Sequence, residues 1–183
     1  MASLICVNGP PAIGKSTIAA LYAERHPGTL NLDIDRLHTL VGGWRDEGNR
    51  THDVLRPVAL AMAAAHLRGG RDVIVPQYLT RADEIEAFED VAHHEGATFR
   101  EIVLMDELAG SIDRFEQRED VSEWELHNRR LVARHGGSAL LASLYRRFLD
   151  VLPLRPRAVV IRSELNAIED TYAQLLQAVE AGR

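Results

Sequence analysis

The sequence feature that most constrains the fold is Gly9–Thr17, which reads GPPAIGKST and matches the pattern G-x-x-x-x-G-K-[ST]. An apolar run of strand length, Leu4–Val7, precedes it, and apolar residues at helical spacing follow it from Ile18 to Tyr22. In a strand–loop–helix unit of this kind, backbone N–H groups and the helix N-terminus face one anion. The stretch therefore predicts a phosphate-binding loop with contacts from Gly9, Ala12, Ile13, Gly14, Lys15, Ser16 and Thr17.

Lys15, inside this loop, is the only lysine among the 21 Lys and Arg residues of the chain. A position that keeps lysine against so strong a preference for arginine is one where a compact ammonium is needed and a planar guanidinium does not serve. We expect Lys15 to reach the β- and γ-phosphates of a nucleotide, and the Ser16 hydroxyl to join the shell of a Mg²⁺ ion. The alternative interpretation is a glycine-rich turn with a solvated lysine.

The composition is that of a single globular domain, 1–183. With 183 residues, 46% hydrophobic and 26% charged, the chain can bury a core without disulfides or a structural metal. Cys6 is the only cysteine, which excludes an internal disulfide and CxxC-type sites. A net charge of −6 disfavours nucleic acid as a partner. No apolar run approaches the roughly 20 residues of a membrane span and no signal-peptide pattern is present, so a cytoplasmic location is expected.

Strand-like apolar runs alternate with helical stretches along the chain. After the first strand, further strands are expected at 29–32, 72–75, 101–105 and 158–161. Helices are expected at about 51–68, from a Thr80–Asp83 capping box to about His94, and near the C-terminus. The apolar side of the first of these helices is expected to carry Leu55, Val58, Met62, Ala65 and His66. The alternation predicts an α/β fold, with a five-stranded parallel sheet covered by helices on both faces.

Asp33 and Asp35 follow the second expected strand, at the sheet edge where ligands of such folds bind. If the chain stays extended there, both carboxylates point to one side because strand side chains alternate. One carboxylate can then hold the water shell of a metal while the other takes a proton from an attacking hydroxyl. The alternative is that one of the two caps the helix that begins at Arg36.

The glycine loop near the N-terminus and the Asp-x-Asp that closes the second strand resemble the small P-loop kinases. This group includes shikimate and gluconate kinases, chloramphenicol phosphotransferase and AAA-type ATPase/kinase proteins. The resemblance is detailed only over the first 35 residues. It implies a three-layer P-loop NTPase sandwich with a helical lid, ATP and Mg²⁺ as cofactors, Asp33 in the metal role and Asp35 in the acceptor or base role.

One departure from the P-loop pattern concerns the metal. Many P-loop enzymes end a further strand with a Walker B aspartate, but the third strand here leads into Pro76-Gln77-Tyr78, with no acid. Asp106 follows the fourth strand, which in this group usually leads to the lid. Either Asp33 carries the Mg²⁺ function, which we favour, or Ser16 and the phosphates hold the ion alone.

A charged stretch at 106–136 is the expected lid insertion. Arg114 and Arg118 lie four residues apart and would share one helix face. The resemblance implies that such a lid delivers arginines to the transferring phosphates, where a cation can raise the rate by about 10³–10⁵. The alternative is a solvated helix with Glu–Arg pairs. The resemblance also places Arg162-Ser163-Glu164, after the fifth strand, against the adenine.

The acceptor pocket is expected between the 51–68 helix and the ends of the second and third strands. Its candidate side chains are His38, Trp44, Arg56, Gln77 and Tyr78. Each of them has an alternative interpretation as an ordinary packing or surface residue. The eight histidines of the chain show no metal-binding spacing.

Together these features predict an ATP- and Mg²⁺-dependent kinase that moves a γ-phosphoryl group to a hydroxyl of a small molecule: a metabolite, a nucleoside or an antibiotic. Nearby alternatives are a nucleoside or nucleotide kinase and a zeta-toxin-like or polynucleotide kinase. A non-catalytic alternative is an ATP-binding regulatory protein. The protein is expected to be a monomer or a homodimer without a membrane partner.

Overall fold

The centre of the fold is a five-stranded parallel sheet in the order β2-β3-β1-β4-β5. A computed structural model describes residues 1–118 and 122–181. The strands are β1 (Ser3–Asn8), β2 (Leu30–Asn31), β3 (Val73–Pro76), β4 (Thr98–Met105) and β5 (Val159–Arg162). Each overlaps a strand expected from the sequence, which confirms the predicted parallel sheet.

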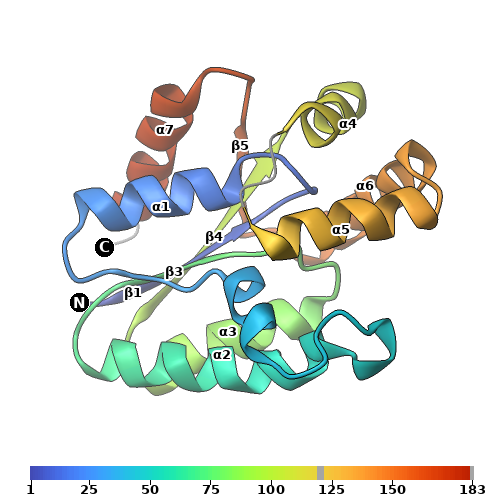
Figure 1. Cartoon of the computed structure of the whole chain (residues 1–183). Coiled ribbons are helices and arrows are strands. Elements are labelled where there is room, and N and C mark those ends of the chain that lie inside the picture. Colours follow the sequence, from blue (N-terminus) through green and yellow to red (C-terminus); the bar gives the residue numbers. More distant parts are fainter. Residues whose placement is uncertain (119–121, 182–183) are drawn as a thin grey trace.

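Helices cover both faces of this sheet, as Figure 1 shows. One face packs against α1 (Lys15–Arg25) and α7 (Ile168–Glu180), and the other against α2 (Thr51–Arg68), α3 (Ala82–His94) and α6 (Ser138–Val151). Strand β1 contributes to both layers because its side chains alternate: Leu4 packs on the α2 side and Ile5 on the α1 side. This two-sided burial explains the continuous apolar run at the start of the sequence.

Several further elements lie beyond the carboxyl ends of the strands. They are α4 (Leu108–Gln117), α5 (Glu123–Arg134) and two short 3₁₀ segments, η1 (Ile34–Leu40) and η2 (Glu47–Asn49). A third 3₁₀ segment, η3 (Leu152–Leu154), connects α6 to the start of β5. Helices α4 and α5 fall in the expected lid, whose residues 119–121 lie outside the described part of the chain. Within the described residues, no helix combines the length and apolar character that crossing a bilayer requires.

Two local predictions were wrong. Helix α2 has the expected bounds but buries Leu55, Ala59, Ala63 and Leu67, whereas Val58 is 45% exposed and Ala65 is exposed. Small alanines let the helix approach the sheet closely, so the buried face follows them and not the larger apolar side chains. Helix α3 starts without the expected Thr80 cap: Arg81 precedes it and pairs with Asp83.

A charge cluster between α3 and β4 lies on the α2 side of the sheet. The Arg155 guanidinium, whose side chain is 11% exposed, lies 2.6 Å from a carboxylate oxygen of Glu89 and 2.7 Å from one of Glu101. Arg157 lies 2.8 Å from Glu89, but its side chain is 84% exposed. Arg155 is therefore the cation that compensates two buried carboxylates.

We expect Arg155→Met to lower the free energy of unfolding at neutral pH by about 3 kcal/mol, because it leaves the buried Glu101 without its counter-charge and Glu89 with only the exposed Arg157. Arg157→Ala is the matched control and should cost less than about 1 kcal/mol, since an exposed pair contributes little. Urea denaturation of both variants measures the difference. Equal losses would show that burial does not set the strength of this cluster.

Candidate active site

The loop between β1 and α1 passes close to β4. Gly9 adopts a φ of 151°, and a Cβ there would lie 2.4 Å from the carbonyl oxygen of Leu104, so only glycine fits. The Asn8 side chain accepts hydrogen bonds from the N–H of Gly9 (2.9 Å) and of Leu79 (2.9 Å), and donates to the Leu79 carbonyl (3.0 Å). These contacts fix the start of the loop against the segment that follows β3.

The rest of the loop bends into the N-terminus of α1. Ala12 has a positive φ of 61° and Gly14 one of 100°, so the chain turns sharply before the helix begins at Lys15. Such a turn groups backbone N–H donors at the end of a helix, an arrangement that binds anions. The predicted strand–loop–helix unit is thus present.

Lys15 reaches back across this loop. Its Nζ donates to the carbonyl oxygens of Gly9 (2.9 Å) and Pro10 (2.7 Å). Burial lowers the pKa of Lys15 to about 8, although Asp35 and Asp33 act in the opposite direction. The ammonium is therefore held against the loop, within the field of the two aspartates.

Asp33 caps a 3₁₀ segment and lies beside Ser16. Its carboxylate caps η1 by accepting a hydrogen bond from the Asp35 N–H at 3.2 Å. Burial raises the pKa of Asp33, while a hydrogen bond from the Ser16 side chain lowers it. The hydroxyl and carboxylate predicted to hold a metal are therefore neighbours. Among the described residues, no group of three or more His, Cys, Asp or Glu is placed to hold an ion, so phosphate or water oxygens would complete such a shell.

Asp35 lies two residues further along, at the same edge of the sheet, and is partly buried. Burial and the neighbouring Asp33 raise the pKa of Asp35 to about 6, while Trp124, Lys15 and Arg118 lower it. A carboxyl with this pKa is ionised at neutral pH and can still take up a proton, which is what general-base chemistry requires.

The two predicted lid arginines differ in their surroundings. Arg114 donates to Asp106 (2.5 Å), to the carbonyl of Ser163 (2.5 Å) and, at 3.5 Å, to that of Ile13. It therefore braces α4 against the loop and the segment after β5, which differs from the predicted contact with a transferring phosphate. Arg118 follows the last residue of α4 and lies 3.6 Å from Glu125. Its positive charge lowers the pKa of both Lys15 and Asp35.

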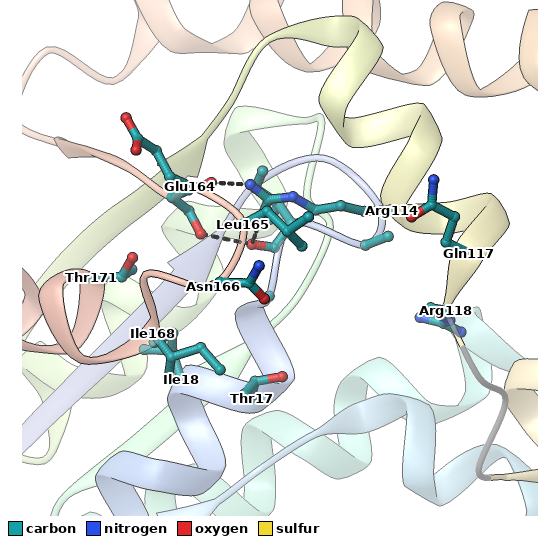
Figure 2. A pocket seen from close by; sticks show the side chains of 14 residues that line it. Thr17, Ile18, Arg114, Gln117, Arg118, Glu164, Leu165, Asn166, Ile168 and Thr171 are labelled. Carbon is teal, nitrogen blue, oxygen red and sulfur yellow. Dashed lines mark hydrogen bonds between the residues drawn. The ribbon is translucent and has the colours of Figure 1, made fainter.

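A pocket of about 360 Å³ opens beside the loop, and Figure 2 shows it. Its walls come from α1 and the loop, from α4, and from the segment after β5, including Thr17, Ile18, Gln117, Glu164 and Asn166. Arg162 does not line it: its side chain is 68% exposed and pairs with Glu164 at 3.1 Å. Alternation along β5 turns Arg162 away from this pocket, whereas Ser163 and Glu164 of the same predicted stretch line it.

The acceptor candidates separate into three groups. His38 and Trp44 are buried in an aromatic cluster with Trp124. Arg56 pairs with Glu84 at 2.9 Å and so joins α2 to α3, and the Tyr78 hydroxyl donates to the Leu144 carbonyl at 2.8 Å and so joins the segment after β3 to α6. Gln77 is buried at the end of β3.

Trp124 is the site residue that the sequence reading missed. It lies on α5, is 6% exposed, and lowers the pKa of Asp35. A signal was present, because Trp124 is a large aromatic in a strongly charged stretch that Ser122 opens with a cap to the Glu125 N–H. Only the packing of α5 on η1 shows which residue this tryptophan meets.

The sheet order, the loop and the aspartates at the carboxyl edge define a small P-loop kinase-like protein. Residues 4–136 match the AAA domain family, and the chain belongs to that family. No curated protein matches the sequence.

Three solved structures are similar over nearly the whole chain. A tunicamycin resistance protein from Deinococcus radiodurans is 16% identical, with a TM-score of 0.64, and the match covers 98% of this chain and 96% of that one. A gluconokinase from Sinorhizobium meliloti is 17% identical, with a TM-score of 0.62 and coverage of 98% of this chain and 94% of that one. A shikimate kinase from Bacteroides thetaiotaomicron is 17% identical, with a TM-score of 0.61 and coverage of 97% of this chain and 98% of that one. At these identities the likeness concerns the fold.

Proposed function

We propose that this protein is an ATP- and Mg²⁺-dependent kinase that transfers the γ-phosphoryl group to a hydroxyl of a small molecule. The observation that carries the proposal is the convergence of Lys15, the Ser16–Asp33 pair and Asp35 at one edge of the sheet. An anion-binding loop alone would suit any nucleotide-binding protein. A buried carboxyl with a raised pKa beside it adds a group that can accept a proton.

Each residue then has a separate role. The loop amides and Lys15 bind the phosphates, and Asp35 orients the acceptor hydroxyl and takes its proton. Mg²⁺, held by Ser16 and Asp33 together with phosphate oxygens, would neutralise charge on the transferring group. Arg118 adds a cation from the end of α4. The pocket lined by Thr17 and Asn166 would receive the base of the nucleotide.

A ligand screen followed by a transfer assay tests the proposal. Hydroxylated metabolites, nucleosides and antibiotics are screened for an increase in Tm together with a non-hydrolysable ATP analogue; saturation at about 100 times Kd adds about 2.7 kcal/mol of stability. Each hit is then incubated with ATP and Mg²⁺, and the product mass is measured. Absence of any stabilisation by the ATP analogue would exclude the proposal. Binding of ATP without transfer to any hit would favour the regulatory alternative.

The two shifted groups predict a bell-shaped pH dependence of kcat/KM. Asp35 must be ionised to act as a base, so activity should rise with pH through the Asp35 pKa of about 6. Lys15 must be charged to bind phosphate, so activity should fall as pH rises through the Lys15 pKa of about 8. Initial rates between pH 5 and 9.5 measure both limbs. An acid limb near the ordinary Asp pKa of about 4 would contradict the assignment of Asp35.

A further inference from the structure

A second pocket lies near the start of β4, whereas the candidate active site lies beyond the ends of the strands. Strand β4 pairs with β1 from Thr98 onward, but its pairing with β5 begins only at Ile102. One edge of β4 is therefore not covered by β5 over residues 98–101. These four residues and Val159, at the start of β5, line a cavity of about 390 Å³, which is large enough for a small molecule.

The turn that precedes β5 places arginines around this cavity. The Ala158 N–H donates to the Arg155 carbonyl at 3.0 Å, so the chain turns before it joins the sheet, and Arg155 and Arg157 both line the cavity. Arg155 is already held by the carboxylates of Glu89 and Glu101. Arg157 contacts Glu89 through Nη2, but its side chain is 84% exposed, so most of its guanidinium remains open to a ligand.

Arg100 gives the second indication of a ligand. Its Nη1 donates to the Phe99 carbonyl at 2.9 Å, but its Nε is buried and has no hydrogen-bond partner within the described residues. A buried donor without a partner is costly, so such an atom calls for an explanation. Nε and Nη2 form the side of a guanidinium that binds a carboxylate or a phosphate through two parallel hydrogen bonds. A rotation of this flexible side chain towards the cavity would bring both donors to one oxyanion.

The charges of the lining favour an anion. Three arginines stand against two glutamates, so positive charge is in excess even with the nearby His93 neutral. Both glutamates already pair with Arg155, which leaves two guanidinium groups for a ligand. The apolar part of the lining includes Phe99 and Val159, and Val159 is 42% exposed.

We propose that this cavity binds a small organic anion. Its carboxylate or phosphate group lies between Arg100 and Arg157, and its apolar part packs on Phe99 and Val159. A planar guanidinium suits either oxyanion, because both accept two hydrogen bonds side by side. The inference does not depend on the proposed function, because the cavity shares no residue with the loop or with the aspartates.

Three small aromatic probes test the charge and the kind of anion. Benzoate and phenyl phosphate carry the two anionic groups on the same ring, and benzamide is the uncharged counterpart of benzoate. Each is titrated into the protein while backbone amide signals are followed by NMR. We expect benzoate, phenyl phosphate or both to shift the signals of Phe99, Arg100 and Val159 with a Kd of about 1 mM, which a ligand of this size can reach. Benzamide should leave these signals in place.

The two anions also distinguish the sources of a natural ligand. A response to benzoate alone would indicate a carboxylic acid, and a response to phenyl phosphate alone would indicate a phosphorylated metabolite. The amide signals of Gly14, Lys15 and Ser16 report any separate binding of phenyl phosphate at the phosphate-binding loop.

Arg100→Met removes the guanidinium and keeps an apolar side chain of similar reach. It should raise the Kd of the responding anion at least about tenfold, the loss expected for hydrogen bonds to a charged group. The Tm without ligand should not fall, because the substitution also removes a buried donor that has no partner. Arg50→Met is the matched control: Arg50 is 78% exposed and pairs with Asp53 at the start of α2, so the same charge is lost elsewhere and the Kd should not change.

The proposal is wrong if neither anion shifts the signals of Phe99, Arg100 and Val159, or if benzamide binds as tightly as benzoate. Shifts confined to Gly14, Lys15 and Ser16 would likewise contradict it. An equal loss of affinity in Arg50→Met and Arg100→Met would show that overall charge, and not this cavity, attracts the anion. None of these results would affect the proposed phosphate transfer, since the titrations require no turnover.

Discussion

Replacing Asp35 with asparagine should lower kcat by about 10³, within the range that a general base contributes, and leave ATP affinity nearly unchanged. The amide has the shape of the carboxyl group but cannot take the proton of the acceptor hydroxyl. The nucleotide contacts come from the loop and Lys15, which this substitution leaves in place. Transfer rates and binding of a non-hydrolysable ATP analogue, measured on the same preparation, separate the two effects.

Stability should move in the opposite direction to activity in this variant. Burial and Asp33 raise the pKa of Asp35 to about 6 in the folded protein, above the ordinary value of 3.8. A raised carboxyl pKa means that ionisation costs stability, and the cost grows as pH rises from about 4 to 6 and persists above 6. Asp35→Asn should therefore have a higher Tm than the parent at pH 8. The exposed Asp90→Asn on α3 is the control, with unchanged rate and Tm. An unaltered kcat in Asp35→Asn would remove Asp35 from the mechanism.

Replacing Lys15 with arginine should reduce kcat/KM by about 10²–10³, the loss typical of removing one preorganised donor, although the positive charge is kept. The Lys15 ammonium fits between the carbonyl oxygens of Gly9 and Pro10, 2.9 and 2.7 Å away. A guanidinium is wider, planar and rigid, and cannot fill the same space or follow a phosphate in the same way. Steady-state kinetics and binding of the ATP analogue measure the loss.

The chain provides a control for this substitution. Arg25, at the exposed end of the same helix, pairs with Glu169 at 2.7 Å, far along α1 from the loop. Arg25→Lys makes the reverse exchange and should leave kcat/KM unchanged. Full activity of Lys15→Arg would mean that the loop needs only a charge, and that the isolated lysine in an arginine-rich chain has no chemical significance.

The strands and the loop could be predicted because their signals are local. A buried parallel strand is a short apolar run, and the glycine pattern requires a specific turn, so neither depends on distant residues. The buried face of α2 could not be read in the same way. Its alanines at 59 and 63 gain their importance from the closeness of the sheet, which hydrophobicity along the sequence does not show.

The placement of the candidate residues could be predicted where they follow strands, but not where they come from helices beyond the sheet. Ser16, Asp33 and Asp35 lie together because parallel strands end at one edge. The surroundings of Arg114 and Trp124 depend on how α4 and α5 pack, since each helix could turn a different face inward without any change in its local pattern. The role of Arg114 in phosphate transfer stays a prediction, as does the lid at 106–136.

The aromatic cluster between η1 and α5 also has a practical consequence. Both tryptophans of the chain, Trp44 and Trp124, lie in it, 6.0 Å apart. The tryptophan fluorescence of the protein therefore originates at a single junction, next to the rings of His38, His52 and His127. Emission intensity and wavelength will report separation of α5 from η1 in real time, without a dye or an engineered label.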